Sequence, residues 1–122
     1  MYSNNSGDII TALGSLSMAY NLDGGENMAY GASTLFFNTS GLQNIAIGKS
    51  ALFSNTVGNS NTALGRNALY SNTNRSNLVT IGDEDLYHNG LDATGGFHAT
   101  NNTAPRSKAI FNNTTGNDNT AT

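Results

Sequence analysis

Apolar and polar residues alternate along this chain in short segments that recur with a 17-residue period. The clearest copies are residues 44–58, NIAIGKSALFSNTVG, and residues 61–73, NTALGRNALYSNT. In Ile45-Ala46-Ile47 the two isoleucines point to one side and the alanine to the other, which is the period-two alternation of a strand. A 17-residue unit is too short for a pair of helices, and a fixed period defines a repeat architecture. The pattern therefore predicts an all-β parallel β-solenoid built from 17-residue coils.

Columns of like residues, 17 positions apart, keep one phase along the chain. Glycines follow each predicted strand, where φ > 0 would turn the chain, and we expect structural corner glycines at Gly14, Gly31, Gly48, Gly65 and Gly82. Asparagines recur in the next turn, and we expect their amides to hydrogen-bond from coil to coil as a ladder of Asn4, Asn21, Asn38, Asn55, Asn72 and Asn89. A third set of apolar residues is expected in the core or between chains: Leu35, Phe36, Leu52, Phe53, Leu69, Tyr70, Leu86 and Tyr87.

The second apolar pair of each coil, such as Leu52-Phe53, is expected on another short strand or on a helical turn. Successive coils would stack at about 4.8 Å. The few bulky apolar side chains in each coil provide little burial against the entropy of ordering its backbone. Burial between chains would help, and the column that contains Phe53 is the natural candidate for it, although these rings could equally fill their own chain's core.

The repeat divides the chain into three parts. Residues 2–89 follow it regularly, residues 90–110 hold an irregular insertion or a degenerate coil, and residues 111–122 resume it in part. The separation of Asn113 from Asn55 is three periods plus seven positions. The phase therefore shifts within residues 90–110.

Composition excludes several classes of protein. Only 37% of the residues are apolar and 11% are charged, with no Trp and no Cys, which argues against a broad globular core and against a disulfide framework. The net charge of −3 and the five scattered Lys and Arg residues give no basic stripe, so we expect no nucleic-acid binding. We expect no membrane insertion, because no stretch has the roughly 18 apolar residues of a span, and residues 1–7 do not resemble a signal peptide.

No pattern of residues predicts catalysis, so we expect neither an enzyme nor a cofactor. The glycines recur as corners rather than as a phosphate-binding loop, and neither His88 nor His98 has triad or metal-ligand spacing around it. Asp83-Glu84-Asp85 is the one cluster of charges. A calcium site built from its oxygens is conceivable, but we expect all three side chains to face water.

The motif Asn-Thr-Ala-x-Gly-x-x-Ala-Leu-x-Ser-Asn-Thr-x-Gly resembles the repeats of phage and bacterial fibre proteins that often precede an endosialidase-type chaperone domain, and it is similar to the head repeats of trimeric autotransporter adhesins. The resemblance covers residues 2–89 and 111–121 and departs from the pattern at Ile10, Tyr30 and Leu78. It implies a left-handed β-roll, a homotrimer, and a structural or adhesive role on a cell surface or a virion, with a surface glycan or receptor as a further partner.

The sequence leaves two other functions open. Thr39, Thr56 and Thr73 form a column that could bind ice or a glycan on a flat Thr and Asn face. Neither end of the repeat carries a recognisable cap, so copies could also stack head to tail into a filament. The alternative for the ends is that the sequence is a segment of a longer fibre.

Overall fold

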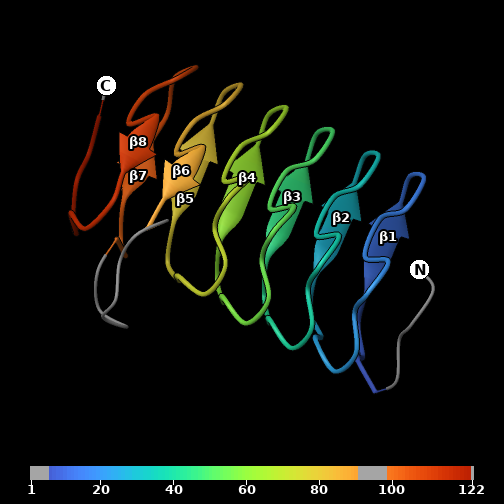
Figure 1. Ribbon diagram of the computed structural model, residues 1–122. Coiled ribbons are helices and arrows are strands. Elements are labelled where there is room, and N and C mark those ends of the chain that lie inside the picture. The colour runs from blue at the N-terminus through green and yellow to red at the C-terminus, as the bar shows by residue number, and fades with distance from the viewer. Residues whose placement is uncertain (1–5, 91–98, 122) are drawn as a thin grey trace.

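The chain folds as an all-β parallel solenoid, in which short strands stack side by side in one long row (Figure 1). The computed structural model describes residues 6–90 and 99–121. Within these ranges there is no helix, and the strands are β1 Thr11–Leu13, β2 Met28–Tyr30, β3 Ile45–Ile47, β4 Thr62–Leu64, β5 Val79–Ile81, β6 His88–Asn89, β7 Thr103–Ala104 and β8 Asn112–Asn113. The predicted solenoid with a 17-residue period is confirmed.

The main sheet contains six parallel strands in the order β1-β2-β3-β4-β5-β7, and β6 and β8 form a second, two-stranded sheet. Neighbouring strands of the main sheet pair each residue with its counterpart in the next repeat, so that Ala29 lies opposite Ala46 and Ala46 opposite Ala63. The sequence columns are therefore physical columns along the solenoid.

Strands β1 to β4 turn their central alanine into the coil and their two flanking residues outward, and β5 has the buried Thr80 in place of the alanine. Ala46 is fully buried, whereas Ile45 and Ile47 are 39% and 37% exposed. The small alanine suits this position because the opposite wall of the narrow coil is filled by leucine. Leu52 and its counterparts from Met18 to Leu86 are fully buried, and Leu78 is a buried leucine in the column of Asn44 and Asn61. The core cluster consists of these residues and of alanines: Met18, Leu35, Leu52, Leu69, Leu78, Leu86, Ala29, Ala46, Ala51, Ala63, Ala68 and Ala104.

The corner glycines directly follow the strands of the first five repeats. Their φ angles lie between +125° and +151°, a region that L side chains rarely adopt. Space is also short, because a Cβ added to Gly48 would lie 2.5 Å from the carbonyl oxygen of Gly65 in the next coil. These positions need glycine both for the turn and for the close approach of successive backbones.

The segment that carries Leu52-Phe53 is neither a strand nor a helical turn, so that expectation was wrong. Ser50 and Leu52 have φ angles of +59° and +51°, with Ala51 between them. This alternation of left-handed residues folds the chain back sharply and directs the leucine into the core. Left-handed conformations cost non-glycine residues about 1–2 kcal/mol each, and the full burial of the leucine offsets that cost.

The structure locates the phase shift found in the sequence. Thr103 of β7 pairs with Val79 of β5, and Asn113 of β8 pairs with Asn89 of β6, so both separations exceed the 17-residue period by seven positions. Asn89 donates from Nδ2 to the Ala99 carbonyl ten residues on, whereas Asn55 makes the equivalent bond to Gly58 three residues on. The seven extra residues therefore lie between Asn89 and Ala99, and the chain from residue 99 to residue 110 follows the ordinary course of a coil.

Candidate functional surface

The outward side of the main sheet carries a row of large apolar side chains that face solvent. Seven strand residues on it are more than a third exposed: Leu13, Met28, Tyr30, Ile45, Ile47, Val79 and Ile81. Ile9 precedes the first strand and is 79% exposed. We call these eight residues the strand face. Contiguous apolar surface of this kind is rare on monomeric proteins and marks interaction sites.

The aromatic column lies on another side of the coil and packs on itself. Phe36, Phe53, Tyr70, Tyr87 and Phe111 stack with nearly parallel rings, and the centroids of neighbouring rings are 5.0–5.3 Å apart. All five rings are partly buried. Burial raises the pKa of the Tyr87 hydroxyl, and the nearby Tyr70 and Glu84 add to this effect. Because each ring face is covered by the next ring, the column joins coils within the chain and leaves mainly ring edges for a partner.

The predicted asparagine ladder joins coil to coil through buried amides. The Nδ2 of Asn38 donates to the Oδ1 of Asn21 at 2.8 Å, and Asn55 donates to Asn38 at the same distance. Asn72 continues the ladder at 3.2 Å. Asn4 lies outside the described residues.

A second asparagine ladder runs beside the first and was not recognised as a ladder from the sequence. It consists of Asn27, Asn44 and Asn61, and later of Asn102 and Asn119. Here the side-chain oxygen accepts from the backbone amide of the next coil, as Asn44 Oδ1 does from the Asn61 amide at 3.0 Å. The signal was available, because the motif begins with an asparagine at this spacing.

The two ladders meet on one carbonyl in the coils that carry both asparagines, and Ile10 and Leu78 replace the second asparagine elsewhere. The Gly58 oxygen accepts from Asn55 Nδ2 at 3.0 Å and from Asn44 Nδ2 at 2.8 Å. A Cβ on Gly58 would overlap the Oδ1 of Asn55, which explains why glycine recurs at this position in other coils. In these coils the buried amides are satisfied by their counterparts, and the narrow coil gains a polar spine in place of a large apolar core.

The first ladder is interrupted where the insertion begins. Asn89 directs its amide to Ala99, and Asn113 of the coil after the insertion then donates to Asn89 at 2.9 Å. As a result the buried Oδ1 of Asn72 has no hydrogen-bond donor within the described residues. In the same coil the glycine column is occupied by Arg75, which is 3% exposed.

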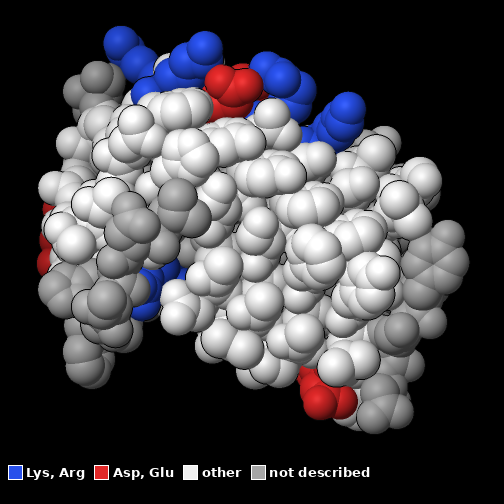
Figure 2. All heavy atoms as spheres, viewed as in Figure 1, with Lys and Arg blue, Asp and Glu red and all other residues white. Residues whose placement is uncertain are grey.

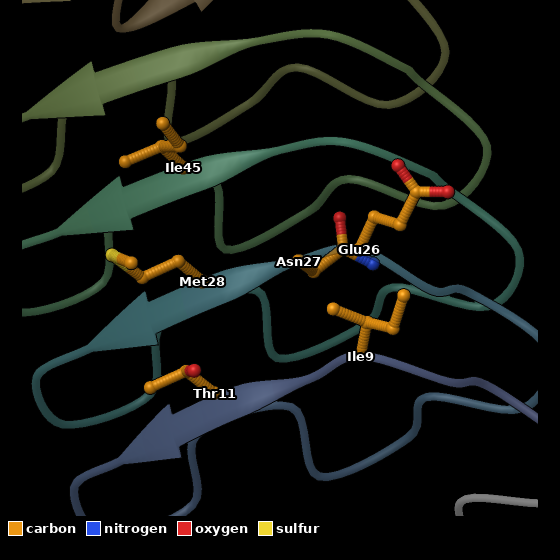
Figure 3. A pocket seen from close by; sticks show the side chains of 6 residues that line it. All are labelled: Ile9, Thr11, Glu26, Asn27, Met28 and Ile45. Carbon is orange, nitrogen blue, oxygen red and sulfur yellow. The ribbon is translucent and has the colours of Figure 1, made fainter.

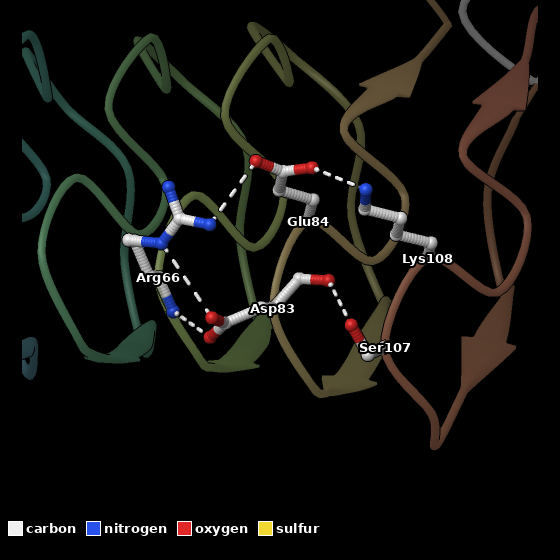
Figure 4. A network of polar contacts seen from close by, with 5 residues as sticks. All are labelled: Arg66, Asp83, Glu84, Ser107 and Lys108. Atoms are coloured by element: carbon white, nitrogen blue, oxygen red, sulfur yellow. Dashed lines mark hydrogen bonds and ion pairs between the residues drawn. The ribbon is translucent and has the colours of Figure 1, made fainter.

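Charged residues gather at the two ends of the strands. Lys49 and Arg66 directly follow the corner glycines, and Arg106 and Lys108 occupy the same rim later in the chain. Figure 2, seen as in Figure 1, shows Lys and Arg with acidic side chains between them along the rim beyond the arrowheads, and further acidic side chains at the opposite rim near the first coils. Arg66 bridges Asp83 at 3.5 Å and Glu84 at 3.3 Å, and Lys108 reaches Glu84 at 3.6 Å (Figure 4).

Asp85 does not face water, which corrects the expectation for the acidic cluster. It is fully buried in the column occupied elsewhere by Ala51 and Ala68. Its Oδ1 accepts from the Ala109 amide at 2.8 Å, while its buried Oδ2 has no partner within the described residues. Burial raises the pKa of Asp85 to about 6, the hydrogen bond from Ala109 lowers it in part, and Asp83 adds to the rise.

The two histidines and the threonine column were the other candidates for chemistry or ligand binding. His88 packs against Tyr87 and contacts the Ser71 hydroxyl at 3.3 Å, whereas His98 lies outside the described residues. In the Thr column, the hydroxyls of Thr39 and Thr56 donate to backbone carbonyls of the next coil. No group of three or more His, Asp or Glu side chains that could hold a metal ion occurs in the described part of the chain.

The fold and the arrangement of its residues define the chain as a parallel β-solenoid with 17-residue coils and a double asparagine ladder. Comparison with family models, with curated proteins and with solved structures found no match. Among the described residues, no helix is long and apolar enough to cross a membrane.

Proposed function

We propose that this protein is a structural segment of a fibre or adhesin shaft, built from copies of the chain that associate through the strand face. The observation that carries the proposal is the set of outward apolar side chains on β1, β2, β3 and β5, which are between 37% and 57% exposed. Removing one such half-exposed side chain from water is worth about 1 kcal/mol. The seven strand residues of the strand face together provide several kcal/mol per copy. This is comparable with the free-energy cost of the translational and rotational freedom lost on association.

The charges at the two rims support a parallel side-by-side arrangement. Lys49 and Arg66 lie at the carboxyl ends of the strands, and Asp8 and Glu26 lie just before strands at the opposite rim. The carboxyl-end rim also carries Asp83 and Glu84, which form ion pairs with Arg66 and Lys108, so that it is mainly rather than wholly basic. Copies with parallel solenoid axes that surround a common axis bring the basic rim of one against the acidic rim of the next. Antiparallel solenoids would place like rims together, which repulsion between like charges disfavours.

The narrowness of the strand face supports three copies. A three-residue strand is only about 10 Å long, so each face offers two outward rows, one at the position of Ile45 and one at that of Ile47. In a closed ring of three, each row can contact a different neighbour, and no apolar row is left on the outside. The homotrimer and its place on a cell surface or virion, where it would present a repetitive surface for attachment, are also what the resemblance of the repeats implies.

A pair of matched substitutions tests the proposal. Ile47→Glu places a charge in the strand face, whereas Val57→Glu places one at a position that is 47% exposed but does not lie on a strand. Sedimentation velocity should show the parent chain and Val57→Glu as the same assembly and Ile47→Glu as a smaller, folded species. Equal behaviour of the two variants would argue that the strand face is not the contact. Growth into particles longer than one chain would indicate head-to-tail stacking instead.

A further inference from the structure

Tyr30 is the one aromatic residue in its column of the strand face. Its counterparts in the other repeats of β1 to β5 are the aliphatic residues Leu13, Ile47, Leu64 and Ile81. The Tyr30 side chain is 55% exposed, more than that of Met28 or Ile47 near it. A large amphipathic side chain that projects from an apolar face is the kind of residue that anchors a protein interface.

A hollow of about 330 Å³ lies at the other end of the same strands (Figure 3). Its apolar walls are Ile9, Met28 and Ile45, and Thr11, Glu26 and Asn27 complete its lining. At about 30 Å³ for each water, the hollow has room for about ten waters and therefore for one aromatic side chain. The fold thus carries a projecting tyrosine and an apolar hollow on the same face.

Glu26 gives this hollow a polar edge. Its Oε2 accepts from the Gln43 Nε2 at 3.1 Å, which ties the carboxylate to the next coil. A carboxylate has room for several hydrogen-bond donors. A phenol that enters between Ile9 and Met28 with its ring among the apolar walls can therefore donate its hydroxyl hydrogen to Glu26.

The projection and the hollow lie at the same height along the solenoid. Tyr30 and Met28 both belong to β2. The hollow begins at Ile9, which precedes β1, and at Thr11 in β1, and it extends to Ile45 in β3, so that β2 lies at its centre. Rotation about an axis parallel to the solenoid keeps equivalent coils level. It also places the carboxyl end of each strand beside the amino end of the strand in the next copy.

From these observations we infer that Tyr30 of one copy inserts into the hollow lined by Ile9, Met28 and Ile45 in the next copy and donates a hydrogen bond to Glu26. This contact fixes the axial register of the copies. Without it, the strand face repeats from coil to coil, and one copy could shift along its neighbour by a whole coil. The inference rests on the proposed association of copies through the strand face.

Photo-crosslinking locates the tyrosine directly. Tyr30 is replaced by p-benzoylphenylalanine, which carries a benzoyl group in place of the hydroxyl and reacts with nearby C–H bonds. A mixture of ¹⁵N-labelled and unlabelled chains separates adducts between chains from those within one. Tandem mass spectrometry should place the inter-chain adducts on Ile9, Met28 or Ile45. Inter-chain adducts confined to β4 or β5, or their absence from an assembly that still forms, would overturn this inference and leave the proposed function standing.

Side-chain truncation gives an independent measure. Tyr30→Ala should weaken association at least about 30-fold, as expected for loss of an interface anchor, and Tyr30→Phe should weaken it less. Tyr20→Ala is the matched control, because Tyr20 is 50% exposed but lies off the strands, and it should leave association unchanged. Equal affinities of Tyr30→Ala and Tyr20→Ala would contradict the inference. A parent chain that stays monomeric at all concentrations would refute this inference and the proposed association together.

Discussion

Leu52 and Ser50 illustrate how single residues set the shape of the coil. Both adopt left-handed backbone conformations, and their counterparts in the other coils do the same. The sequence could not predict this, because leucine is a poor residue for a left-handed turn and glycine was the expected one. The glycines occupy other places, where φ is larger and the next backbone comes close. Burial of the leucine, rather than local preference, decides the conformation.

Asp85 makes stability depend on pH. The folded-state pKa of about 6 lies above the ordinary value of 3.8, so folding favours the protonated carboxyl. The stability contributed by this group is fully present below about pH 4 and is lost as the pH rises through 6. In earlier coils the hydroxyls of Ser17 and Thr34 donate to the corner carbonyls of Gly14 and Gly31, a bond that protonated Asp85 can imitate.

Asp85→Asn should therefore stabilise the fold at pH 8, by about 1–3 kcal/mol from a shift of about two pKa units, and should have little effect at pH 4. Urea unfolding at both pH values, at one protein concentration, measures the difference. Asp83→Asn is the control, since Asp83 is exposed and bridges Arg66. If Asp85→Asn gave the same change at pH 4 and pH 8, the buried carboxyl would not be the titrating group.

At the scale of elements, stability rests on the asparagine ladders more than on the three-residue strands. Asn55 alone donates to Asn38 and to Gly58 and accepts from Asn72. The regular phase of the sequence indicated the column in which the hydrogen bonds run from Asn21 to Asn72. The shared carbonyl of Gly58 and the break after Asn72 could not be foreseen, since both depend on how the turn and the insertion pack.

Asn55→Ala should destabilise the fold by about 2–4 kcal/mol, because it leaves buried groups of Asn38 and Asn72 without their partners. Asn74→Ala, at an exposed asparagine of the following turn, should change stability by no more than about 0.5 kcal/mol. The urea midpoints of the two variants at equal protein concentration measure this contrast. A similar small shift of the urea midpoint for both variants would mean that the ladders contribute little to the stability of the fold.

For the whole molecule, the 17-residue period was sufficient to predict the solenoid, whereas the exposed apolar strand face was not foreseen. The aromatic column was the candidate from the sequence, yet its rings stack on one another, and the isoleucines around Ala46 face solvent instead. Alternation shows that two sides of a strand differ, but not which of them is inside. Here the coil is too narrow for isoleucine opposite leucine, so alanine takes the interior.

The central claim is that the strand face is covered by other copies of the chain. Native mass spectrometry of the unmodified chain tests it most directly, because one chain has a mass of 12.7 kDa. The account predicts one dominant species of three chains, with a circular-dichroism spectrum rich in β structure. A single 12.7 kDa chain that remains folded and soluble at high concentration would contradict it.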